Sequence, residues 1–123
     1  MSIVISILQI VVALGLLNVW LLRFSQSTAY RGGDARTMAD EFAAYGLPRW
    51  STYVIGALKV GAALCLIAGL WVHFLVFPAA LLIAILMVGA IAMHLKIGDP
   101  FRKSIPALGM LTLSVIICLA SRP

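Results

Sequence analysis

One uninterrupted apolar stretch, residues 74–94, reads FLVFPAALLIAILMVGAIAMH and contains no Asp, Glu, Lys or Arg. A helix needs about 20 predominantly apolar residues to cross the hydrocarbon core of a bilayer. This stretch therefore predicts a transmembrane helix. Three other stretches meet the same criterion, so we expect four spans, at residues 3–24, 52–72, 74–94 and 104–120.

The composition of the whole chain leads to the same prediction. Of its 123 residues, 63% are hydrophobic and 11% are charged, whereas soluble domains average about 45–50% and about 25%. A soluble fold of this length could not bury so much apolar surface, so lipid must be part of the solvent. We predict an all-α integral membrane four-helix bundle, with residues 1–123 forming a single transmembrane domain.

A short amphipathic segment, residues 34–45, separates the first two spans. Asp34 can cap the start of a helix there. Met38, Phe42 and Tyr45 recur at helical spacing and share one face. We expect a surface helix that lies on the membrane or closes the open end of the bundle.

The basic residues are distributed unevenly between the two sides of the predicted bundle. Nearly all of them lie in or beside the loops that follow the first and third spans. The positive-inside rule then places both long loops in the cytoplasm and both termini outside, in a multi-pass protein of a bacterial inner (cell) membrane. The net charge of +5 suits anionic lipid headgroups. It does not indicate nucleic acid, since no basic patch with interleaved aromatic residues is present.

A few polar residues lie within or near the ends of the spans and are candidates for binding a ligand. Lys59 lies within the second span, where a lysine costs about 2.5–3.5 kcal/mol at the helix centre. It either snorkels to the headgroups or faces the bundle interior to meet a substrate or an acidic partner. Asn18 lies at a similar depth in the first span, on the same side, so the two side chains can meet inside the bundle. Lys96 and Trp50, near span ends on that side, complete the ligand-binding candidates.

Candidate acid/base residues gather at the same end. The third span ends in the sequence MHLKIGDP, residues 93–100, in which His94 and Asp99 can hold a proton between them. Histidine exchanges protons near neutral pH. Asp40 and Glu41, in the amphipathic segment, lie on the same side of the membrane. We therefore name His94, Asp40, Glu41 and Asp99 as catalytic candidates, with interfacial decoration of helix ends as the alternative interpretation.

No covalent cofactor or metal site is expected from the sequence. No group of residues has zinc-ligand spacing. His73 and His94 lie at opposite ends of one span, about 30 Å apart, and so cannot share a haem. The second span also carries small residues at every fourth position, a pattern that lets two helices approach closely in lipid: Ala57, Gly61, Cys65 and Gly69.

Four stretches of the sequence, covering nearly the whole chain from about Phe42 onward, resemble the DoxX-like family of small four-span membrane proteins. They are YGLPRW at 45–50, IGALKV at 55–60, LMVGAIAMH at 86–94 and DPFRKSIPA at 99–107. Many members of that family carry a glutamate where this chain has Lys59. Some members are associated with membrane quinone chemistry, including a thiosulfate–quinone oxidoreductase subunit, which implies a quinone as ligand.

Three functions follow as hypotheses. The first is a protein or redox-associated subunit that binds a quinone-like or other apolar ligand near Lys59, Asn18 and His94, with a redox partner protein. The second is a cofactor-independent enzyme that performs acid/base isomerisation, cyclisation or epoxide opening on an apolar substrate. The third is a membrane assembly factor that acts through the small-residue stripe. The sequence leaves open whether the chain is an enzyme, and it allows a homo-oligomer.

Overall fold

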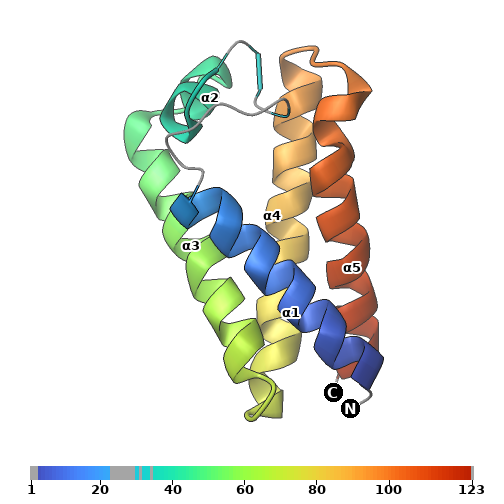
Figure 1. The fold of residues 1–123 in the computed structure, drawn as a ribbon. Helices are drawn as coiled ribbons and strands as arrows, with labels where there is room; N and C mark the ends of the chain where they lie inside the picture. The colour runs from blue at the N-terminus through green and yellow to red at the C-terminus, as the bar shows by residue number, and fades with distance from the viewer. Residues whose placement is uncertain (1–2, 23–29, 31, 34, 123) are drawn as a thin grey trace.

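The computed structural model describes residues 3–22, 30, 32–33 and 35–122. Within this part the secondary structure is entirely helical, as predicted, and four long helices form a bundle (Figure 1). The helices are α1 (Ile3–Leu17), α2 (Met38–Ala44), α3 (Arg49–Ala68), α4 (Val76–Lys96) and α5 (Ile105–Ser121). A π-helical turn, Asn18–Leu22, continues α1, and 3₁₀ turns precede α4 (His73–Leu75) and α5 (Phe101–Ser104).

Four helical segments are long and apolar enough to cross a membrane. They are Ile3–Leu22, Arg49–Ala68, His73–Lys96 and Phe101–Ser121, with mean hydropathies between 1.7 and 2.8. Each overlaps one of the predicted spans. The second begins and ends earlier than predicted, because Pro48 precedes the first helical turn and the backbone leaves the helix at Gly69.

The main core is built from small and branched side chains of the four long helices. They include Val12, Ala63, Leu66, Ala80, Ile83 and Ile117, all fully buried. In lipid the hydrophobic effect does not drive helices together, so their association depends on close van der Waals packing, which small residues allow. In the upper part of Figure 1 the helices diverge, and α2 lies across this end, opposite both termini. We call it the α2 end.

The small-residue stripe of the second span contributes to close packing within the chain over only part of its length. Ala57 and Gly61 are exposed, and a Cβ added at Gly61 would meet no described atom within 4 Å. Gly69, by contrast, is buried, and a Cβ added there would lie 2.5 Å from Val76 Cγ2; another close approach occurs at Gly56, which faces the Trp20 ring. Because α3 turns Gly56, Ala63 and Leu66 inward, Ala57 and Gly61 face outward, whereas Cys65 packs against the main core.

The amphipathic segment forms a shorter helix than predicted. α2 begins at Met38, and the Thr37 side chain caps it by accepting a hydrogen bond from the Asp40 amide at 3.1 Å. Asp34, the predicted cap, lies outside the described residues. The predicted apolar face is confirmed, since Met38, Phe42 and Tyr45 are all buried in one cluster with Trp20.

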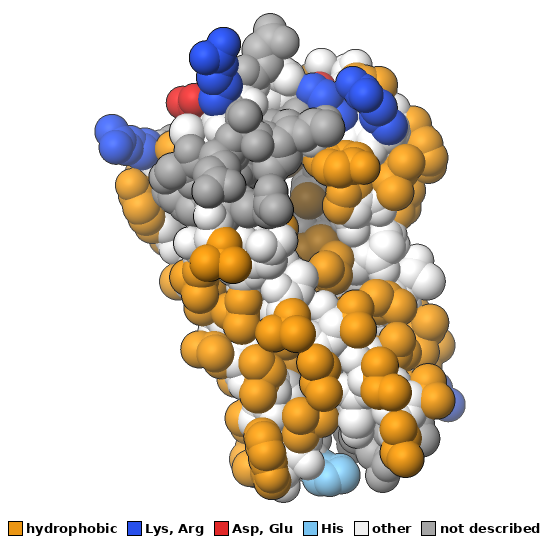
Figure 2. All heavy atoms as spheres, in the orientation of Figure 1, with side chains coloured by type: hydrophobic (Ala, Val, Ile, Leu, Met, Phe, Trp, Pro, Cys, Tyr) orange, Lys and Arg blue, Asp and Glu red, His pale blue; other side chains and the backbone are white. Residues whose placement is uncertain are grey.

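α2 therefore covers the end of the bundle through its apolar side. The Phe42 ring meets Trp20 edge-on at 6.0 Å between centroids. On the face drawn in Figure 2, most of the Lys, Arg, Asp and Glu side chains gather at the α2 end, and apolar side chains cover the rest. The polarity predicted from the sequence is thus present in the fold.

Candidate functional site

A cavity of about 860 Å³ lies between the long helices at the α2 end. All four spans and α2 contribute to its wall, which is mostly apolar. Its polar lining residues are Asn18, Tyr30, Glu41, Tyr45, Lys59, His94 and Lys103. Side chains that can donate, accept or carry charge therefore gather around one cavity.

The end of α4 positions the first pair of polar groups. Gly98 adopts φ +71°, and the chain turns back so that the Asp99 amide donates to the His94 carbonyl at 3.0 Å and the Gly98 amide to the Leu95 carbonyl at 3.2 Å. These are the two bonds of a Schellman motif, which brings the residue after the glycine beside the third-last helical residue. An apolar contact usually joins those two positions. Here His94 Nδ1 and Asp99 Oδ2 lie 2.7 Å apart instead.

The Asp99 carboxylate is held by several partners although it is almost fully buried. Its Oδ1 accepts from the Gly33 amide at 3.0 Å and lies 3.8 Å from Lys103 Nζ. Desolvation alone would raise the pKa of Asp99, but the hydrogen bonds with His94 and Gly33 and the charge of Lys103 outweigh it, so that its pKa lies below the ordinary value. Asp99 is therefore an ionised acceptor at neutral pH.

The ionised state of Asp99 fixes the orientation of His94. A carboxylate only accepts hydrogen bonds, so His94 Nδ1 must carry a proton. Nε2 then lies 3.5 Å from Tyr45 Oη and 3.9 Å from Glu41 Oε1. Asp99 thus holds the ring with Nε2 directed to the polar side chains of α2, an arrangement suited to proton exchange.

Glu41 and Tyr45 are neighbours on α2 because they are four residues apart. The Tyr45 hydroxyl donates to Glu41 Oε1 at 2.5 Å, and the Gly32 amide donates to the same oxygen at 3.1 Å. The Tyr45 ring meets the His94 ring nearly perpendicularly, with centroids 5.8 Å apart. We call Glu41, Tyr45, His94 and Asp99 the polar chain.

Lys59 enters the same cavity from α3. Its Nζ lies 5.2 Å from the centre of the Trp20 ring, within cation–π range. Trp20 belongs to the π-helical turn that follows α1, and π-helical turns are frequent at functional sites. Of the two alternatives for Lys59, a snorkelling side chain and one facing the interior, the structure has the second.

The structure brings five of the candidate residues together and separates three. Lys59, Asn18, Glu41 and His94 line the cavity, and Asp99 holds His94 from behind. Three candidates lie outside the cavity lining: Asp40 and Trp50 are exposed, and Lys96 donates from its Nζ to the Tyr45 carbonyl at 2.9 Å.

Sequence reasoning missed Tyr45, Trp20 and Lys103 as parts of the site. Tyr45 was counted only as an apolar face residue, although its spacing of four from Glu41 signals a side-chain pair. Lys103 has the same spacing from Asp99. Trp20 had no such signal, because its direction depends on the π-helical turn.

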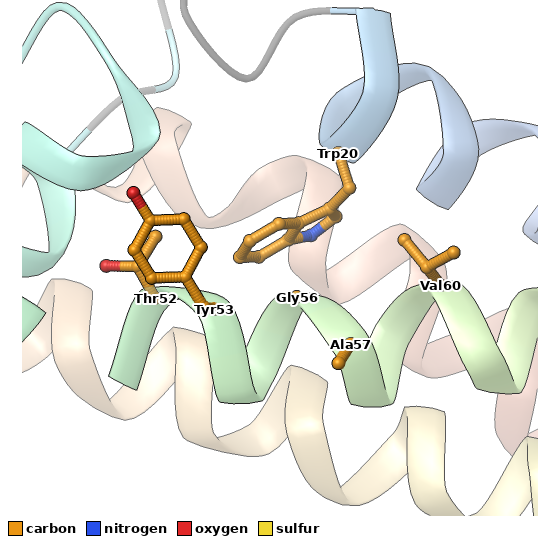
Figure 3. A pocket seen from close by; sticks show the side chains of 6 residues that line it. All are labelled: Trp20, Thr52, Tyr53, Gly56, Ala57 and Val60. Atoms are coloured by element: carbon orange, nitrogen blue, oxygen red, sulfur yellow. The ribbon is translucent and has the colours of Figure 1, made fainter. Parts of the chain in front are cut away.

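A second hollow, of about 290 Å³, lies beside α3 and is almost wholly apolar. Figure 3 shows the Trp20 ring lying over Gly56 between Tyr53 and Val60. Trp20 borders both hollows and separates them. The Thr52 hydroxyl is buried here and forms no hydrogen bond within the described part of the chain.

Among the described residues, no group of three or more His, Cys, Asp or Glu side chains is placed to hold a metal ion. The residues around the cavity instead offer aromatic and aliphatic surfaces together with hydrogen-bonding groups. This donor set suits an organic molecule with a polar head.

Comparison with known proteins identifies the family. Residues 7–117 match the DoxX-like family. The chain belongs to the DoxX-like family. It is also 32% identical over 78 residues to the uncharacterised protein YdgD of Bacillus subtilis (strain 168), a match that covers 63% of this chain and 68% of YdgD. No solved structure matches. With its four apolar helices, this DoxX-like chain is a multi-pass membrane protein.

Proposed function

We propose that this DoxX-like protein binds an apolar molecule with an oxygen-bearing head, such as a quinone, in the cavity at the α2 end. One observation carries the proposal: an apolar cavity of about 860 Å³ has a buried, hydrogen-bonded polar chain at its wall. Sites for small organic ligands typically measure about 300–1,000 Å³ and combine apolar walls with a few placed polar groups.

The residues suggest how such a ligand would lie. Apolar side chains of α4 and α5, among them Met87, Ala90 and Met110, would contact its ring or tail. A ligand oxygen would face Lys59, whose ammonium donates hydrogen bonds, and a ligand hydroxyl could donate to His94 Nε2. The ligand would enter from the lipid, and we propose that the α2 end faces the cytoplasm, where the basic loops belong. In a redox role, a partner protein would exchange electrons with the bound quinone.

Quenching of Trp20 fluorescence by a quinone tests this proposal. Trp50 and Trp71 are 66% and 77% exposed, so Trp50→Phe with Trp71→Phe leaves the buried Trp20 as sole reporter. We expect saturable quenching by decylubiquinone in nanodiscs, and no saturation with the free fluorophore N-acetyltryptophanamide.

A matched pair of variants shows whether the cavity is the site. Ala90 lines the cavity and Ala92, on the same helix, is exposed and does not. Ala90→Phe should abolish saturable quenching, and Ala92→Phe should leave it unchanged. If decylubiquinone and other quinones never saturate, or if both variants bind like the parent, the proposed function is wrong.

The polar chain also favours a second candidate, a cofactor-independent acid/base enzyme. Asp99 fixes the tautomer of His94, and Nε2 is directed toward Tyr45 and Glu41 at the cavity wall. A base so oriented can abstract a proton from a bound substrate or protonate it. Isomerisation, cyclisation and epoxide opening are the reactions that fit.

This candidate predicts turnover without an added electron carrier. Purified protein would be incubated with a panel of lipophilic epoxides and enones, and their consumption followed by mass spectrometry. His94→Gln should abolish turnover and retain Trp20 quenching by the substrate. A panel converted equally fast by His94→Gln would dismiss an acid/base role for His94.

A further inference from the structure

The most unusual group in the cavity is the Lys59 ammonium. An ammonium carries three hydrogen-bond donors. Within the described part of the chain, the contact that Lys59 makes is to the face of Trp20, 5.2 Å from the ring centre, and the ring accepts no conventional hydrogen bond. A cation removed from water is costly unless it is paired and hydrogen-bonded.

The neighbouring lysines differ from Lys59 because each of them already donates to a protein oxygen. Lys103 donates from its Nζ to the Gly33 carbonyl at 2.6 Å and lies 3.8 Å from Asp99. Lys96 donates to the Tyr45 carbonyl at 2.9 Å. Of these three lysines, Lys59 is the one that donates to no oxygen within the described part of the chain, so all three of its donors are open to a ligand.

The acids at this end form the hydrogen bonds described here with groups other than Lys59, and the charge of Glu41 acts on Lys59 without a hydrogen bond between these two side chains. Glu41 Oε1 already accepts from Tyr45 and Gly32, and Asp99 is held by His94 and Gly33. Among the charged groups at the wall, Lys103 lies 3.8 Å from Asp99 and is offset by it, whereas Lys59 has no such close carboxylate within the described part of the chain. An anionic oxygen placed at Lys59 would give the ammonium the hydrogen-bonding partner that it lacks among the described residues.

We propose that Lys59 selects ligands whose head is anionic, so that the cavity takes amphiphilic acids, such as long-chain carboxylates or ionised hydroxyquinones, in preference to neutral molecules of the same shape. This inference rests on the proposed function, because it names the substrate class of that cavity. The ligand oxygen accepts charge-assisted hydrogen bonds from Lys59 Nζ. Trp20 holds the ammonium from the other side.

A pair of matched probes tests the proposal in nanodiscs of phosphatidylcholine, which supply no net anionic lipid. Dodecanoate and dodecanol differ only in the head, and each would displace a neutral quinone from the protein that carries Trp20 as sole tryptophan. We expect dodecanoate to bind at least tenfold more tightly than dodecanol. Lys59→Met, which keeps the length of the side chain and removes its charge, should erase that preference, so that the two probes compete equally for the quinone that the variant still binds.

Two controls separate local from general effects. Lys59→Arg should keep the preference for the acid. Arg102→Met removes an exposed cation at the same end of the bundle and should also leave it unchanged. Phosphatidylglycerol, an anionic lipid, would then be added to the nanodiscs to show whether the acid comes from the bilayer. If this lipid competes with dodecanoate in the parent protein and not in Lys59→Met, an anionic lipid is a ligand of the same class.

The outcomes distinguish this inference from the function on which it rests. If the protein binds neutral quinones and the two dodecyl probes equally, selection by Lys59 is wrong while binding in the cavity stands. A preference for dodecanoate that survives in Lys59→Met also overturns it. If none of the probes binds, both proposals are wrong.

Discussion

The contact between Gly56 and Trp20 gives the sharpest quantitative prediction about the site. A Cβ at Gly56 would lie 2.7 Å from Trp20 Cζ3 and 2.8 Å from Cε3, whereas a Cβ at Gly61 would meet no described atom within 4 Å. Both glycines lie inside α3. Gly56→Ala and Gly61→Ala therefore make the same chemical change on one helix, and only the first meets the ring.

The expected magnitudes follow from two opposing effects. Replacing a glycine inside a helix by alanine stabilises the helix by up to about 1 kcal/mol. Overpacking a filled contact typically costs about 1–3 kcal/mol. Because both variants share the helix effect, it cancels in their difference, and the free energy of unfolding of Gly56→Ala should be about 1–3 kcal/mol lower than that of Gly61→Ala.

The assay is reversible unfolding in mixed micelles by titration with sodium dodecyl sulfate, with Trp20 as sole tryptophan. Gly56→Ala should also shift the emission of folded Trp20, because the ring must move away from α3, and should weaken quinone quenching at the cavity. Equal free energies of unfolding for the two variants, with unchanged Trp20 emission, would refute the packing described for this contact.

Two further predictions concern the polar chain. Asp99 has a lowered pKa in the folded protein, so its ionised form contributes stability that is present above the ordinary aspartate pKa of about 4 and is lost as the pH falls below it. Asp99→Asn should therefore lower the free energy of unfolding at pH 7 and flatten its decline between pH 4 and pH 3 in the same titration; an equally steep decline would contradict this. Tyr45→Phe removes the hydroxyl that donates to Glu41 at 2.5 Å and should cost about 1.5–3 kcal/mol, the usual range for a hydrogen bond to a charged group. A loss below about 0.5 kcal/mol, the low end for an ordinary hydrogen bond, would contradict it.

The spans could be predicted from the sequence because one strong physical effect decides them. A helix satisfies its own backbone hydrogen bonds in lipid, so a long apolar stretch is sufficient to predict a span and does not depend on tertiary contacts. The apolar face of α2 was readable for a similar reason, since Met38, Phe42 and Tyr45 follow the helical period. The start of α2 was not, because Thr37 and Asp34 are both good caps and only the folded chain shows which one is used.

The site could be predicted in its location but not in its pairings. The charge pattern placed His94, Glu41 and Asp99 at one end, and the sequence Gly98-Asp99 after His94 contained the turn that joins them. The direction of Lys59 depends on Trp20, which in turn depends on a π-helical turn that hydropathy cannot reveal. Tertiary contacts of this kind decide whether a lysine within a transmembrane helix reaches the membrane surface or faces a binding cavity.

The long-range bonds of the polar chain couple the site to the closure of the bundle. Tyr45 and His94 are 49 positions apart in the sequence, and Gly33 and Asp99 are 66 apart. These groups meet only when α2 covers the bundle, so the unfolded chain has no comparable site. A ligand that binds the folded state alone stabilises it by RT ln(1 + [L]/Kd), about 2.7 kcal/mol at a concentration of 100 Kd. Any true ligand of the cavity must therefore raise the resistance to sodium dodecyl sulfate of the parent protein and must fail to do so in Ala90→Phe, because that variant fills the space which the ligand occupies.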